Sequence, residues 1–336
     1  MRFVICGVGA IGGVLGGQLV KAGFEVLGID PAPEHAAAIN THGLQLKGLH
    51  GQHTLRLPVV RRAAHVAFRP EDVILLAVKS GQCGRAVAAL RRATRLDLPL
   101  VCAQNGVTNE ALAARTFRQV NGLMLLIGAT CLRPGEVIHT GNGPVGVGTY
   151  PTGVHPVAEA VAAALEQTDL AVYTTADIRR AKWHKLLLNL NTATLGLTGL
   201  STQEAMAEAT VRAWMAEVWE EGVRVVEKAG LEYVEPPGMA SIGEHIHALR
   251  TDAAPILAVP TAADTTGRSS LWQDLYHRRG VVEVEYLNGV IVRLGRQYGV
   301  PTPYNSLLRT VSHTMARARA LPGQYTIADL RALLRD

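Results

Sequence analysis

The sequence is poor in aromatic residues and has no segment of low complexity. Phe, Trp and Tyr make up 5% of its 336 residues, so small and branched aliphatic side chains must fill most of the interior. Hydrophobic residues reach 48% and charged residues 18%, which excludes a disordered chain. The length is sufficient for two domains of ordinary size, each with its own core.

Cysteine is also scarce. The four cysteines form no CxxC pair and have no zinc-type spacing with histidine, which argues against a metal site. In a chain of this length we expect them to be buried thiols of a protein in a reducing cytoplasm. They are Cys6, Cys83, Cys102 and Cys131.

A dense block of positive charge is missing as well. The formal net charge is +5, but the arginines come in pairs such as Arg61 and Arg62, so we expect no nucleic-acid partner. A mild positive charge suits an anionic small molecule. The apolar N-terminus is rich in glycine and is better explained by a strand and a turn than by a signal peptide. No other apolar run reaches membrane length, so we expect a cytoplasmic protein without a membrane partner.

Strand and helix patterns alternate in the first part of the chain. Strands are expected at 2–6, 25–29, 73–78 and 98–102, with helical segments between them and paired, glycine-rich strands after residue 121. We therefore predict an α/β fold, in which a Rossmann-type parallel sheet domain (1–176) precedes an all-helical C-terminal domain (177–336). Helices of the second domain are expected at 178–200, 203–230, 269–277, 281–298, 304–318 and 326–335.

A glycine motif follows the first strand. Gly7, Gly9 and Gly12 form G-x-G-x-x-G between a strand and a helix, which is the context that dinucleotide binding requires. Gly7 allows the tight turn, Gly9 the approach of a pyrophosphate and Gly12 close packing of helix and strand. With Ala10 and Ile11, they would present backbone N–H groups of a helix N-terminus to the phosphates.

Two charged residues stand at the ends of later strands. Asp30 can accept hydrogen bonds from the adenosine ribose and repel a 2′-phosphate, which favours NAD over NADP, or it can simply cap the next helix. Lys79 follows the strand at 73–78 and can meet either a cofactor phosphate or solvent.

The segment KWHKLLLN (182–189) places Lys185 and Asn189 four residues apart, on one face of a helix. A lysine enclosed by leucines needs partners, and partial desolvation would make it a better proton donor near neutral pH. The alternative is that its stem packs while the ammonium reaches water. The residues alone leave both interpretations open.

Eight spaced motifs resemble those of the ketopantoate (2-dehydropantoate) reductase family. They are GVGAIGG (7–13), VILLAVKSGQ (73–82), AQNGV (103–107), PGEVIHTGNGPVGVG (134–148), KWHKLLLN (182–189), GRSSLWQD (267–274), EVEYLNG (283–289) and GVPTPYN (299–305). The resemblance implies reduction of a 2-oxo acid to a 2-hydroxy acid by NADPH or NADH, and specifically of ketopantoate to pantoate, a precursor of pantothenate.

The same resemblance implies residue roles. Lys185 matches the lysine that protonates the ketone, facing a cleft between the domains, and Glu283 matches the acidic residue that orients the site. Asn105, Asn189 and Ser270 match substrate-binding positions. Asn105 is also expected at the nicotinamide, and Lys79 at the cofactor.

The chain departs from the family pattern at two places. Asp30 and Pro31 stand where NADP-dependent members have an arginine, and Ala193 stands where they tend to have a second asparagine. A branch of relatives that is NAD-dependent and forms D-2-hydroxy acids from other branched or aromatic 2-oxo acids is therefore the alternative. A long irregular loop from His247 to Arg268 is expected to shape the pocket.

Other residues and surfaces are assigned no catalytic role. His245 and His247 are expected at the surface, and His139 is expected to be structural. Apolar helices of the second domain make a homodimer plausible. A nucleotide-binding sensor without catalysis is a remote alternative, against which the intact motif residues argue.

Overall fold

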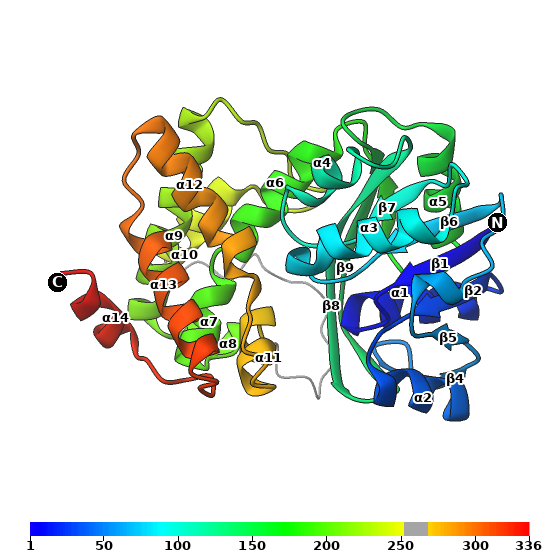
Figure 1. The fold of residues 1–336 in the computed structure, drawn as a ribbon. Coiled ribbons are helices and arrows are strands. Elements are labelled where there is room, and N and C mark those ends of the chain that lie inside the picture. Colours follow the sequence, from blue (N-terminus) through cyan, green and yellow to red (C-terminus); the bar gives the residue numbers. More distant parts are fainter. Residues whose placement is uncertain (252–267, 336) are drawn as a thin grey trace. The chain divides into compact units, whose positions relative to one another are not determined.

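The computed structural model describes residues 1–251 and 268–335, and they divide into two compact units (Figure 1). The first is Met1–Ala181, and the second begins at Lys182. None of the described helices is long and apolar enough to cross a membrane. The described ranges also contain no group of three or more His, Cys, Asp or Glu that could hold a metal ion.

One sheet organises the first unit, in the order β4-β3-β9-β8-β7-β6-β1-β2-β5, with β10 paired to β9. All strand pairs are parallel except the hairpins β3–β4 and β8–β9. The strands are β1 (Arg2–Cys6), β2 (Glu25–Ile29), β3 (Leu44–Gly48), β4 (His53–Leu55), β5 (Val59–Val60), β6 (Asp72–Leu76), β7 (Leu100–Cys102), β8 (Val120–Arg133), β9 (Glu136–Thr149) and β10 (Val172–Thr174).

Apolar side chains cover both faces of this sheet. Phe3 and Ile5 of β1 pack into one cluster and Val4 and Cys6 into another, because successive strand residues point to opposite faces. The first cluster includes residues of α1 (Ala10–Lys21) and α5 (Pro156–Leu165), and the second includes residues of α3 (Cys83–Ala93). The remaining helices are α2 (Pro33–His42), α4 (Asn109–Ala113) and the short 3₁₀ helices η1 (Ala63–His65) and η2 (Ser80–Gln82).

The second unit is helical. Its helices are α6 (Ile178–Asn189, which begins in the first unit), α7 (Thr192–Thr198), α8 (Thr202–Ala207), α9 (Ala209–Lys228), α10 (Ile242–Thr251), α11 (Ser270–Tyr276), η3 (Glu283–Tyr286), α12 (Asn288–Tyr298), α13 (Pro303–Arg317) and α14 (Ile327–Leu333). The predicted fold class, an α/β sheet domain followed by a helical region, is confirmed.

The predicted helix at 178–200 is wrong in its continuity, because the chain forms α6 and α7 with a break at Leu190 and Asn191. The Asn191 side chain donates to the Met215 carbonyl at 2.9 Å, and the Thr192 hydroxyl donates to the Asn189 carbonyl at 2.7 Å. These side-chain hydrogen bonds replace the helical ones at the break.

Three further predictions about the second unit are corrected. The helix at 203–230 is broken at Glu208, and the one at 281–298 is a 3₁₀ turn followed by α12. The predicted loop after His247 is helical as far as Thr251, where α10 ends. The rest of that predicted loop, residues 252–267, lies outside the described residues.

Candidate functional site

The carboxyl ends of four neighbouring parallel strands carry the residues predicted for cofactor binding. Along β2, β1, β6 and β7 these ends lead to Asp30, Gly7, Lys79 and Asn105, respectively. In open α/β sheets ligands bind at this edge. The fold of the first unit therefore brings these sequence-distant residues to one side of the sheet.

The glycine loop has the shape that a dinucleotide requires. Gly7 has a φ of +94°, which favours glycine, and a Cβ on Gly12 would collide with the Gly7 carbonyl oxygen. A Cβ on Gly9 would meet nothing within 4 Å, so the space above it is open. Helix α1 begins directly afterwards, and its first N–H groups, at Ala10 and Ile11, are available for a phosphate. These residues fit a dinucleotide cofactor.

Asp30 is anchored at the edge of this loop. Its Oδ2 accepts from the Val8 N–H at 2.9 Å and its Oδ1 from the Ala32 N–H at 3.0 Å. Ala32 is the N-cap residue of α2, so Asp30 supports the start of this helix. Each carboxylate oxygen has a second lone pair, and the carboxylate can still accept a ribose hydroxyl.

Sequence reasoning missed His35, which also holds the glycine loop. The Nε2–H of this buried imidazole donates to the Val8 carbonyl at 2.9 Å, and its Nδ1 accepts from the Gly135 N–H at 3.0 Å. The Gly135 donor requires an unprotonated Nδ1, so the proton lies on Nε2. His35 thus ties the loop to the β8–β9 turn, and no local motif marks it.

The turn after β7 fixes the backbone at Asn105. Its carbonyl accepts from the Ser80 hydroxyl at 3.0 Å and from the Asn109 amide at 2.9 Å. Gly106 follows with a φ of +83°, so the QNG turn needs glycine there. Asn105 and Lys79 are both half-buried.

Lys185 and Asn189 both lie on α6, so the predicted i, i+4 spacing is present. Asn189 is buried, whereas Lys185 keeps some exposed surface although protein atoms surround it densely. Burial lowers the pKa of the Lys185 ammonium from 10.5 to about 8. A lysine of this kind can donate and recover a proton near neutral pH.

A buried polar network, not anticipated from the sequence, holds the end of α6. Asn288 donates through Nδ2 to the Leu190 carbonyl at 3.0 Å and to Asn305 Oδ1 at 2.9 Å. Asn305 in turn donates to the Glu221 carboxylate, through its N–H at 2.8 Å and its Nδ2 at 2.7 Å. Helices α9, α12 and α13 thereby fix the helix that carries Lys185.

Ser270 and Glu283 line one small pocket of the second unit. Ser269 is the N-cap of α11; its hydroxyl accepts from the Trp272 N–H and donates to the Thr192 carbonyl at 2.9 Å. Ser269 is therefore structural, and Ser270 remains for the pocket. The pocket is lined by Thr192, Ala193, Ser270, Leu271, Asp274, Glu283, Val284 and Leu287.

The two glutamates of EVEY have different surroundings. Glu283 lines the pocket, whereas Glu285 forms ion pairs with Arg309 at 2.6 Å and Arg293 at 2.9 Å. Glu285 therefore secures η3 to α12 and α13. Asp274, which sequence reasoning missed, also lines the pocket and is 3% exposed.

The predicted surface position of His245 is wrong. This side chain is 2% exposed and lies on the apolar side of α10, 5.9 Å from the Trp219 ring, while His247 is exposed as predicted. His184 is also fully buried, and burial, followed by the charges of His245 and Lys185, lowers its pKa to about 4.

Of the four cysteines, three are buried as expected, but Cys131 is only half-buried.

Two family models match the chain and together cover most of it. A model described as ketopantoate reductase PanE/ApbA matches residues 3–152, and its C-terminal counterpart matches residues 177–316. The chain belongs to the ketopantoate reductase family. It is thus an NAD(P)-dependent oxidoreductase acting on CH–OH groups, and its reaction class is NAD(P)H-dependent reduction of a small 2-oxo acid.

Similar proteins agree with this membership in the ketopantoate reductase family. The 2-dehydropantoate 2-reductase of Pyrococcus abyssi is 29% identical over 309 residues, covering 92% of this chain and 95% of the relative. The family member from Ralstonia eutropha has a TM-score of 0.78 at 27% identity, covering 95% of this chain and 99% of that one. A D-mandelate dehydrogenase bound to NADH and anilino(oxo)acetate has a TM-score of 0.80 at 25% identity, covering 96% and 100%.

Proposed function

We propose that this chain reduces ketopantoate to pantoate, with Lys185 as the general acid. The observation that carries the proposal is the state of Lys185. The pKa of its ammonium is lowered to about 8, and the residue lies on the same helix as Asn189. Hydride addition builds negative charge on the ketone oxygen, and a nearby ammonium stabilises that charge and supplies the proton. We assign residues 1–176 to cofactor binding and 177–336 to substrate binding.

The other site residues have binding and orienting roles in this proposal. The nicotinamide supplies the hydride when it is bound. Ser270 grips the substrate carboxylate, Glu283 orients the site, and Asn105 and Asn189 bind the substrate through amide groups. These groups fix the ketone relative to Lys185, and such positioning can account for a large part of a rate enhancement.

NADH is the proposed cofactor, because the Asp30 carboxylate is held at the edge of the glycine loop by two backbone N–H groups. A 2′-phosphate placed there would face an anchored negative charge. Lys79 supports binding of the cofactor phosphates with either dinucleotide.

A second candidate substrate is a bulkier branched or aromatic 2-oxo acid, giving a D-2-hydroxy acid. Ala193 lines the pocket together with Leu271, Val284 and Leu287. Asn191 does not replace the missing amide, since it is buried and bonded to the Met215 carbonyl and to Thr194. An apolar wall favours an apolar substrate side chain.

The test is the initial rate of reduction with ketopantoate and with benzoylformate (an aromatic 2-oxo acid), each with NADH and with NADPH. We expect turnover of ketopantoate, faster with NADH. A rate confined to benzoylformate would replace the first substrate by the second. No turnover of either acid, from protein shown to bind NADH, would refute the proposed function.

A further inference from the structure

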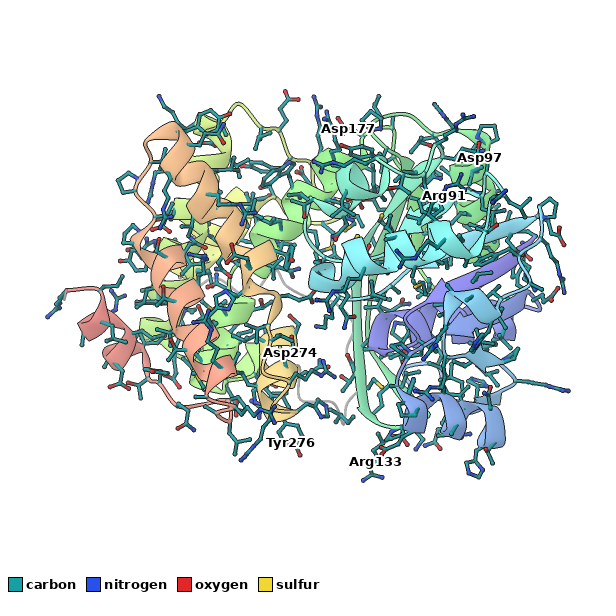
Figure 2. The ribbon with its side chains drawn as sticks, in the orientation of Figure 1. Arg91, Asp97, Arg133, Asp177, Asp274 and Tyr276 are labelled. Atoms are coloured by element: carbon teal, nitrogen blue, oxygen red, sulfur yellow. The ribbon has the colours of Figure 1, made fainter. Side chains whose placement is uncertain are left out.

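The pocket that holds Ser270 contains a second carboxylate besides Glu283. Asp274 is 3% exposed and lies on α11, one turn after Ser270 (Figure 2). The proposed substrate is itself a carboxylate. Three negative groups in one small, partly desolvated pocket would repel each other strongly unless a positive charge lies beside them.

Arg279 supplies such a charge from the turn that follows α11. Its Nη1 donates to Asp274 Oδ1 at 2.6 Å, and its backbone N–H donates to the Asp274 carbonyl at 3.2 Å. The Arg279 side chain is 40% exposed, so it reaches inward from the surface to a buried acid. Arg279 is not among the residues that line the pocket, but it contacts the lining residue Asp274.

The ion pair between Arg279 and Asp274 also lies in the segment that connects α11, which carries Ser270, to η3, which carries Glu283. The chain leaves α11 at Tyr276, turns through Arg278 with a φ of +50°, and reaches Glu283 four residues after Arg279. Val281 in this connection is 73% exposed, so it contributes little packing. The ion pair therefore joins the turn to the helix that carries Ser270.

We propose that Arg279 is a charge-balancing and positioning residue that allows the pocket to bind an anionic substrate by neutralising Asp274. This inference rests on the proposed reduction of a 2-oxo acid. Without Arg279, the negative charge of Asp274 would act on the substrate carboxylate without the counter-charge that Arg279 supplies. At separations of about 6 Å and an effective dielectric constant near 20, that repulsion corresponds to a loss of affinity of roughly tenfold to a hundredfold.

The experiment measures kcat and KM for the better of ketopantoate and benzoylformate at saturating NADH. Arg279→Gln should raise KM at least tenfold and change kcat much less. The double variant Arg279→Gln with Asp274→Asn should bring KM back to within about threefold of the wild type, because the negative charge that Arg279 balances is removed together with it. Arg278→Gln, a change of the same kind at the exposed neighbouring residue, should change neither constant.

If the ion pair between Arg279 and Asp274 were purely structural, the double variant should have a KM no lower than that of Arg279→Gln. The inference is therefore overturned by an unchanged KM in Arg279→Gln, or by a double variant that is as impaired as the single one. If Arg279→Gln does not fold, Asp274→Asn alone decides. It should lower KM at least threefold by leaving Arg279 uncompensated, and a KM that stays equal or rises rejects the inference.

The wild-type control separates the two levels of the proposal. If the wild type turns over neither acid, the proposed function fails and the role of Arg279 fails with it. If the wild type is active and the variants behave like Arg278→Gln, only the role of Arg279 is rejected. Binding of NADH, followed by fluorescence, should be unchanged in every variant.

Discussion

Replacing Lys185 by Met should strongly reduce turnover and at the same time stabilise the protein. The ammonium group has a pKa lowered from 10.5 to about 8 by burial, so its charged form is disfavoured in the folded state. At about 1.4 kcal/mol for each tenfold change, this corresponds to roughly 3 kcal/mol of folding free energy at neutral pH. Met has a similar stem without the charge, and should recover about 1–3 kcal/mol.

The sign of the pH dependence follows from the lowered pKa. The destabilisation is fully present below pH 8 and disappears as pH rises to 10.5, where the unfolded chain also loses the proton. For catalysis, reduction needs protonated Lys185, so kcat for the oxo acid should fall as pH rises through about 8. Oxidation of the 2-hydroxy acid needs the neutral amine of Lys185, so its kcat should rise as pH rises through about 8.

The assay combines NADH absorbance for turnover with urea unfolding for stability. Lys185→Met should reduce kcat by about 10²–10⁴-fold, the usual range for a general acid, and lose the limb near pH 8. Lys228→Met, at an exposed position of α9, removes the same charge and should leave both properties unchanged. The reasoning would be refuted if Lys185→Met kept more than a tenth of the activity, or if it were less stable than the wild type.

Three further predictions concern the cofactor, the support of α6 and acid stability. Asp30→Asn keeps an acceptor but removes the charge, and should raise the NADPH-to-NADH ratio of kcat/KM about tenfold; an unchanged ratio would exclude Asp30 as the determinant. Asn288→Ala removes the hydrogen bond to the Leu190 carbonyl and should lower the unfolding free energy by about 1–3 kcal/mol in urea titrations. An unchanged unfolding free energy would contradict a stabilising role of this network. The pKa values of buried His139 and His184 are lowered from 6.5 to about 4. Between these pH values the unfolded chain binds more protons than the folded protein. The stability of the folded protein should therefore fall as pH drops from 6.5 towards 4. At pH 5 the loss should be about 2 kcal/mol per histidine, and a pH-independent unfolding midpoint over this range would contradict it.

Local patterns were sufficient to predict the sheet and its glycine loop. Alternation of strand and helix signals, and glycines between a strand and a helix, depend on residues close together in the chain. The same holds for the spacing of Lys185 and Asn189 on α6. The breaks at Asn191 and Glu208 were missed, since helix periodicity continues across them and the breaks depend on contacts such as that of Asn191 with Met215.

The chemical groups of the protein and most of the order of its strands and helices can be predicted from local spacing along the chain. Which groups meet depends on how the chain packs. His35 reaches Gly135 across 100 residues, and Asn288 reaches Leu190 across 98. The buried position of His245 and the pairing of Asp274 with Arg279 likewise depend on how the chain packs around them. A hydrogen bond between distant segments leaves no periodic trace, since its partners are brought together by burial of apolar surface elsewhere.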